Sequence, residues 1–140
     1  MADLNKINAF VENLAEKVHD LGADTLTVAL CAAANAPVAT NSVLADLTQA
    51  AYTYCSARVV SITTSAQTGG TYKLVLADLV LTASGGAVGP FRYVVLYNDT
   101  PSSPADPLIG WYDYGSDITL AAGETLEIDF DADAGVLTLA

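Results

Sequence analysis

Basic residues, histidine and cysteine are scarce in this chain of 140 residues. Five Lys and Arg stand against 16 Asp and Glu, which gives a formal net charge of -11. The five basic residues are scattered along the sequence as Lys6, Lys17, Arg58, Lys73 and Arg92. A strongly negative protein repels a phosphate backbone, and five dispersed cations do not form a basic patch. We therefore expect no nucleic-acid partner.

Long apolar runs are also missing. No stretch approaches the roughly 18–20 apolar residues of a membrane-spanning helix, and the first six residues lack the basic start and apolar core of a secretory signal. We expect no membrane partner and synthesis in a reducing cytoplasm, where Cys31 and Cys55 stay free thiols. A disulfide between them remains open where the protein meets an oxidising medium.

The usual combinations of catalytic residues are absent from the pattern. A Ser or Cys nucleophile would need the single histidine, His19, as its base. That residue falls on the polar side of a predicted helix, where we expect it to be solvated. No Gly-x-Ser-x-Gly elbow occurs, and two cysteines with one histidine at wide separations do not make a zinc site. We expect no enzyme activity, no metal and no cofactor.

Alternating aspartates near the C-terminus resemble the opening of a calcium loop. A loop of the EF-hand type needs Gly at its sixth position and Glu at its twelfth, but Ala134 and Ala140 stand there. We interpret the run as a strand end with its carboxylates facing water. A looser calcium site and a hydrolase with paired carboxylates stay open as alternatives. The aspartates concerned are Asp129, Asp131 and Asp133.

The first 22 residues carry a helical pattern. Their apolar residues recur with a 3-4-3-4-3 spacing, which predicts an amphipathic helix that begins at Asp3 as N-cap and ends at Gly22. Over fewer than three heptads this spacing does not distinguish a coiled-coil seam from an ordinary amphipathic face. Packing on the chain's own β-domain, on a partner protein or on a second copy stays open. The predicted interface residues are Leu4, Ile7, Val11, Leu14, Val18 and Leu21.

From residue 25 onward the pattern changes to short β-type runs bounded by Gly, Pro, Asn and Asp. Roughly eight to ten strands at regular spacing predict a mainly β fold, an antiparallel β-sandwich or jelly-roll-like barrel over residues 23–140. The turn Ala121-Ala122-Gly123 predicts a hairpin. The predicted strand segments are 25–31, 42–47, 50–54, 57–64, 71–82, 91–97, 108–114, 117–120, 124–130 and 135–139.

Aromatic residues cluster in the second half of the chain. Trp111, Tyr112 and Tyr114, with Tyr93 and Tyr97 from the preceding strand, suggest a sugar-binding platform or a protein-contact patch. Tyr and Trp also fill sandwich cores and the centres of subunit interfaces, and we favour that interpretation here.

Three segments of the sequence resemble small virion structural proteins of tailed bacteriophages, of the capsid decoration (cement) type. They are 38–46 (VATNSVLAD), 89–100 (GPFRYVVLYNDT) and 108–126 (LIGWYDYGSDITLAAGETL). The resemblance implies a non-enzymatic, β-rich protein that is made in the host bacterial cytoplasm. It also implies a homotrimer on the outer capsid surface that braces the major capsid protein.

Within this resemblance we expect residues 1–45, with the helix, to supply docking or oligomer contacts. The alternative is a tail or fibre component that contacts host glycans through the aromatic patch Trp111, Tyr112 and Tyr114.

Overall fold

The computed structural model describes residues 3–140 and shows a mainly β protein with antiparallel sheets and one short N-terminal α-helix. Residues 1 and 2 of the predicted helical segment lie outside the described residues. The helices are α1 (Asn8–Ala15) and the single 3-10 turns η1 (Ala33–Asn35) and η2 (Leu44–Asp46). The strands are β1 (Asn5–Lys6), β2 (Leu26–Cys31), β3 (Val59–Val60), β4 (Ile62–Thr68), β5 (Thr71–Leu76), β6 (Leu79–Thr82), β7 (Val88–Asn98), β8 (Leu108–Leu120), β9 (Thr125–Ile128) and β10 (Leu137–Leu139).

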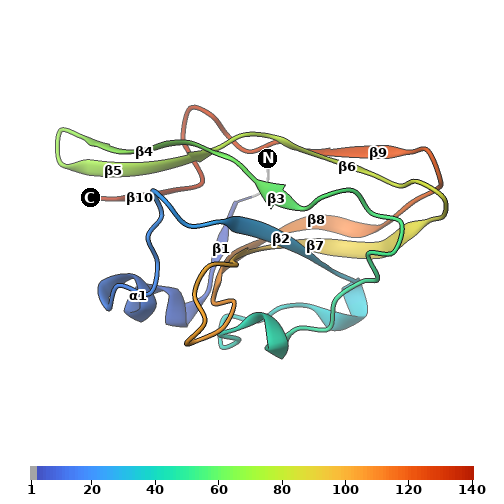
Figure 1. Cartoon of the computed structure of the whole chain (residues 1–140), viewed down its shortest axis with the longest axis horizontal. Coiled ribbons are helices and arrows are strands. Elements are labelled where there is room, and N and C mark those ends of the chain that lie inside the picture. The colour runs from blue at the N-terminus through green and yellow to red at the C-terminus, as the bar shows by residue number, and fades with distance from the viewer. Residues whose placement is uncertain (1–2) are drawn as a thin grey trace.

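A five-stranded sheet in the order β1-β8-β7-β2-β3 forms the middle of the molecule. Two smaller sheets, β10-β5-β4 and β6-β9, lie over one of its faces, and α1 with the loops that contain η1 and η2 lies over the other (Figure 1). The strand β2 is consequently buried along its whole length. Neither face of the strand meets water, and accordingly all residues of Leu26–Cys31 except Thr27 are apolar.

The N-terminal helix is much shorter than predicted. It begins after Ile7, which has no side-chain cap, and the chain leaves the helix at Lys17, whose φ is 68°. The predictions of Asp3 as N-cap and Gly22 as terminator were therefore wrong. The cause is the sheet: β1 pairs with β8, and the amide of Ile7 donates to the carbonyl of Ile109 at 3.1 Å. These bonds hold the first apolar residues in extended conformation.

Several strand boundaries differ from the prediction. The segment 42–47 forms η2 instead of a strand, because the Asp46 carboxylate accepts hydrogen bonds from the amides of Ser42 and Val43 and curls the chain locally. The segment 50–54 contains no strand. The run 71–82 divides into β5 and β6, whereas 108–120 forms one long strand, β8.

The hairpin predicted at Ala121-Ala122-Gly123 does not form. The turn is present, with the amide of Glu124 donating to the carbonyl of Ala121 at 2.9 Å, but β8 pairs with β7 and β9 pairs with β6. The chain crosses from one layer to the other at this turn. A two-residue period predicts which face of a strand is apolar, but it does not specify the strand with which it pairs. For β9 that partner is β6, which is distant in the sequence.

One continuous hydrophobic core joins the layers. Ile7, Phe10 and Leu21 from the N-terminal segment belong to the same cluster as the buried residues of the sheets. Phe130, which follows β9, is 1% exposed and meets the ring of Tyr112 in β8 edge-on, with centroids 6.0 Å apart. The apolar alternation predicted for residues 126–130 is confirmed for Ile128 and Phe130, both of which are buried.

We predict that Phe130→Ala lowers the free energy of unfolding by about 3–5 kcal/mol, because it leaves a cavity between the two layers. Val80→Ala, in β6 of the same layer, should change it by less than about 0.5 kcal/mol, since the Val80 side chain is 49% exposed. Urea unfolding of both variants measures the difference. Equal stability of the two would mean that the layers do not share a core.

Candidate functional site

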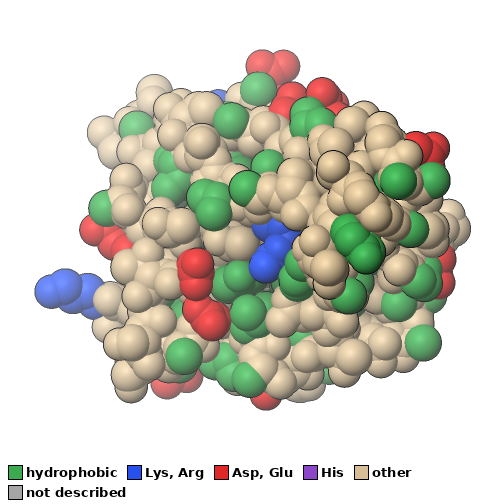
Figure 2. Space-filling model, turned by 45° about the vertical axis from the view of Figure 1, so that its right-hand side comes forward, with side chains coloured by type: hydrophobic (Ala, Val, Ile, Leu, Met, Phe, Trp, Pro, Cys, Tyr) green, Lys and Arg blue, Asp and Glu red, His purple; other side chains and the backbone are tan. Residues whose placement is uncertain are grey.

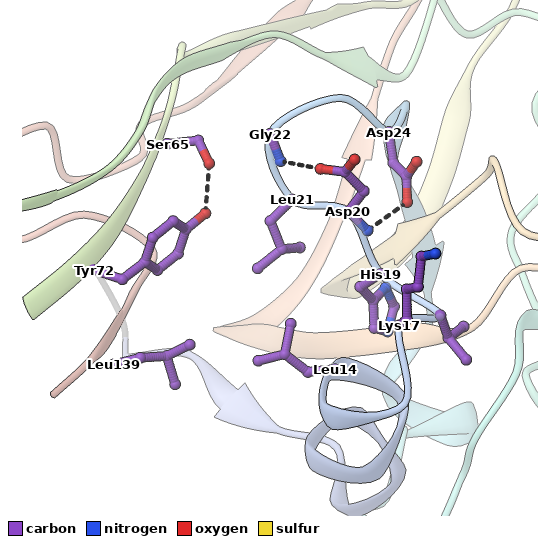
Figure 3. A pocket seen from close by; sticks show the side chains of 11 residues that line it. Leu14, Lys17, His19, Asp20, Leu21, Gly22, Asp24, Ser65, Tyr72 and Leu139 are labelled. Atoms are coloured by element: carbon purple, nitrogen blue, oxygen red, sulfur yellow. Dashed lines mark hydrogen bonds between the residues drawn. The ribbon is translucent and has the colours of Figure 1, made fainter.

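A cleft of about 520 Å³ opens between residues 14–24 and the sheet β10-β5-β4. We call it the α1 cleft. The end of α1 and the turn that follows it form one wall, and the inner side of the β4–β5 hairpin with the C-terminal strand forms the other (Figure 3). The lining residues are Leu14, Lys17, Val18, His19, Asp20, Leu21, Gly22, Asp24, Ser65, Tyr72 and Leu139.

The centre of the α1 cleft is apolar, whereas charged and polar side chains make up much of the rest of its lining. Leu14 and Leu21 point into it from one wall, and Tyr72 and Leu139 point toward them from the other (Figure 3). The hydroxyl groups of Tyr72 and Ser65 are hydrogen-bonded to each other at 2.8 Å, which fixes the Tyr72 ring. Leu139 is 45% exposed, so a large apolar side chain stands open to solvent at the mouth.

The predicted apolar stripe is divided by the structure. Ile7 and Leu21 are buried in the core, and Val11 is 52% exposed on the outer side of α1. The other stripe residues, Leu4, Leu14 and Val18, are half-buried. Because the helix ends at Ala15, the 3-4 spacing no longer places later residues on one helical face. Three of the six, Leu14, Val18 and Leu21, nevertheless meet again in the wall of the α1 cleft.

Tyr72 and Leu139 were missed by the sequence argument. Both lie in segments predicted as strands, but nothing in the sequence indicates that the β4–β5 hairpin and the C-terminal strand lie opposite residues 14–24. Contacts between segments that are far apart in the sequence depend on the order of the strands in the sheets, and local periodicity does not reveal that order.

A buried polar network lies behind the cleft. Asn98, which is fully buried, donates through Nδ2 to His19 Nδ1 at 3.1 Å and to Asp24 Oδ2 at 2.6 Å. Its Oδ1 accepts from the amide of Thr100 at 3.1 Å. Two acceptors around the amide nitrogen and one donor at the oxygen fix the orientation of the Asn98 amide. The network joins the segment after α1 to the end of β7.

His19 is buried, with 6% of its surface exposed, and the expectation of a solvated histidine was wrong. Its ring lies 5.2 Å from that of Phe10, and its Nε2 is sealed from solvent without a hydrogen-bond partner among the described residues. Burial lowers the pKa of His19, and the nearby Asp24 carboxylate opposes that effect in part. Nδ1 accepts from Asn98, so the neutral ring is the form that fits the network.

The two cysteines are free thiols in the structure, with Cys31 buried and Cys55 half-buried. Burial raises the pKa of the Cys31 thiol to about 11 and also raises the pKa of Cys55. The thiolate is the nucleophilic form of cysteine, so both side chains are poorly suited to nucleophilic attack near neutral pH.

The predicted aromatic patch is not one surface. Tyr112 is buried and Tyr114 is 61% exposed, and both line a second cleft of about 360 Å³ next to β9, which we call the β9 cleft. Trp111, the residue before Tyr112, is half-buried, lies on the opposite face of β8 and does not line this cleft. Burial raises the pKa of Tyr112 to about 12, so its hydroxyl stays protonated.

One carboxylate of the aspartate run 129–133, that of Asp131, is directed at the local backbone. Asp131 Oδ1 accepts from the amides of Asp133 and Ala134, both at 2.9 Å, and these bonds lower the pKa of Asp131. Within residues 3–140, no three His, Cys, Asp or Glu side chains are grouped so that they could hold a metal ion. No helix in the described chain has the length and apolarity to cross a membrane.

Comparisons of the chain with protein-family models, with curated proteins and with solved structures found no match.

We predict that protonation of His19 destabilises the protein below pH 6.5. The folded state lowers the pKa of His19 from its ordinary value of 6.5, so the unfolded chain takes up the proton first as the pH falls. The free energy of unfolding should therefore decrease from about pH 6.5 downward, until the folded state also binds the proton.

Urea midpoints at several pH values between 5 and 7.5 measure this slope. His19→Gln should remove it, because the chain has only one histidine. Asp106→Asn serves as the control, because burial and a hydrogen bond between the carboxyl groups of Asp106 and Asp99 raise the pKa of Asp106, so its titration changes stability in the opposite sense. The decrease toward low pH should therefore remain in Asp106→Asn, and a decrease that persists in His19→Gln would contradict the assignment to His19.

Proposed function

We propose that this chain is a non-enzymatic structural protein of a tailed-bacteriophage virion, of the capsid decoration type, that binds the major capsid protein on the outer lattice. The observation that carries the proposal is the α1 cleft, an open apolar recess in a protein of net charge -11. Apolar recesses bordered by polar residues on a soluble surface mark sites of protein contact. The three resembling sequence segments supply the particular partner.

The state of the reactive side chains agrees with a binding role. The only histidine of the chain is enclosed behind Asn98 and its Nε2 does not meet solvent. Burial holds both thiols in their protonated form near neutral pH. His19, Cys31 and Cys55, which are of the residue types often used as base and nucleophile, therefore have structural surroundings and not catalytic ones.

The surface also suits an outer-shell position. Acidic side chains lie at separate places around the face drawn in Figure 2, and apolar side chains are spread across it instead of forming one large patch. Such a surface keeps the protein soluble and does not attract it to packaged DNA. We propose that the protein is made in the host bacterial cytoplasm and is located on the capsid surface of the virion.

For the architecture we propose a β-sandwich, in which the five-stranded sheet is one layer and β10-β5-β4 with β6-β9 is the other. The shared core and the crossing of the chain at residues 121–123 support this description. We propose further that the protein acts as a homo-oligomer, with the trimer as the expected form. Interfaces of about 1,200–2,000 Å² in total are typical of stable association, which exceeds the area of the cleft alone.

The division of the aromatic patch favours this function over a glycan-binding tail or fibre component. Trp111 on one face of β8 and Tyr112 with Tyr114 on the other do not make a common stacking platform for a sugar. The decoration role depends on the α1 cleft and not on these aromatic residues.

We predict that Leu139→Asp lowers binding to assembled shells of the major capsid protein by at least about tenfold, because it places a charge in the apolar mouth of the α1 cleft. Sedimentation of shells with bound protein measures the occupancy. Deletion of residues 2–22 would not isolate the docking site, because it also removes the core residues Ile7, Phe10 and Leu21 and so disturbs folding.

Val80→Asp is the matched control, because Val80 and Leu139 are almost equally exposed, at 49% and 45%, and the charge change is the same. Val80→Asp should bind as the unmodified chain does, and both variants should keep its melting temperature within a few degrees. Full occupancy by Leu139→Asp would contradict the assignment of the α1 cleft as the docking site.

A further inference from the structure

The β9 cleft combines an apolar floor, an exposed aromatic ring and carboxylates without a basic partner. We propose that it binds a basic segment of a partner protein, with an arginine side chain lying against Tyr114 and paired with Glu127 and Asp129. This site is separate from the α1 cleft, and the inference does not depend on the proposed function.

The floor of the β9 cleft suits the aliphatic part of a long side chain. Val94 from β7 and Leu126 and Ile128 from β9 line it, and the volume of about 360 Å³ exceeds that of any single amino-acid side chain. Arginine and lysine bury their methylene groups on such surfaces while the charged end stays near water. An apolar floor below a polar rim therefore favours an amphipathic occupant over a small ion.

The charges at the rim select a cation. Glu127 and Asp129 are exposed, and neither is in an ion pair with a basic residue of the described chain. The third acid of the cleft, Asp113, is already satisfied by Arg92, whose Nε and Nη2 donate to it at 2.8 and 3.0 Å. Two carboxylates thus remain uncompensated in a protein that is negative overall. A guanidinium group pairs with carboxylates in two-point geometry, which an ammonium group does not.

The aromatic wall adds a reason to expect arginine. The ring of Tyr114 is 61% exposed, and guanidinium groups stack on tyrosine faces. The same contact already occurs elsewhere in this chain, where the guanidinium carbon of Arg58 lies 3.6 Å from the centre of the Tyr52 ring.

The position of β9 suits an extended segment. β9 pairs with β6 along one edge only. Four consecutive residues, 126–129, line the cleft and none from β6 does, so the cleft runs along the free edge of β9. Free strand edges bind extended peptides through backbone hydrogen bonds, while alternate side chains enter neighbouring pockets. A segment of alternating apolar and arginine residues fits both features.

The probe is an end-capped tetrapeptide of alternating valine and arginine, added to the ¹⁵N-labelled full chain and followed by NMR. We expect saturable shifts of the backbone amides at 112–114 and 126–129, and affinity reduced about tenfold by Glu127→Gln with Asp129→Asn. The control is Glu12→Gln with Glu16→Gln, an equal charge change at two exposed residues on or next to α1, which should retain the affinity.

The same peptide with citrulline in place of arginine keeps the shape but not the charge, and it should not bind. Five results would overturn the proposal: no binding of the arginine peptide, equal binding of the citrulline peptide, equal loss in both double variants, the same shifts produced by maltotriose, or the same shifts produced by raising the protein concentration alone. The last two would assign the cleft to a sugar or to a second copy.

Discussion

The burial of β2 on both faces is the constraint on which the rest of this structure depends. A six-residue strand with no exposed side chain requires a cover above and below. The two smaller sheets provide one cover, and the N-terminal segment with the loops around η1 and η2 provides the other (Figure 1). The segment 3–24 thus contributes to the core, through Ile7, Phe10 and Leu21, and is not an arm attached to it. Apolar burial of this kind is the main favourable term in folding.

The α1 cleft follows from the same arrangement. The β4–β5 hairpin and β10 extend past the central sheet above the segment that leads from α1 to β2, and the two walls do not close against each other. The network of His19, Asp24 and Asn98 holds the lower wall to the end of β7. A fully satisfied polar group at the centre of such a network gives the wall a fixed position, which a docking surface requires.

The sequence was most informative where a pattern is local. The period of two predicted the strands around 26–31, 91–97 and 124–130, and with them the mainly β, antiparallel class. It misjudged the N-terminal helix, because the same 3-4 spacing fits a short helix flanked by extended residues that pair with β8. The predicted exposure of His19 was wrong for a related reason. Its polar neighbours suggested solvent, whereas Asn98, 79 residues later, encloses it. The two clefts were beyond sequence reasoning, since each joins segments that are distant in the sequence, residues 14–24 with β4, β5 and β10 in one, and β7 with β9 in the other.

The central claim of this account is that the molecule acts by contact, with the α1 cleft as the contacting surface. Hydrogen exchange of the full chain, free and bound to assembled shells of the major capsid protein, tests it most directly. The account predicts slower exchange at residues 14–24 and 137–139 in the bound state and unchanged exchange in β6. Bound protein whose exchange at those residues is unaltered, or a chain that does not bind the shells, would contradict it.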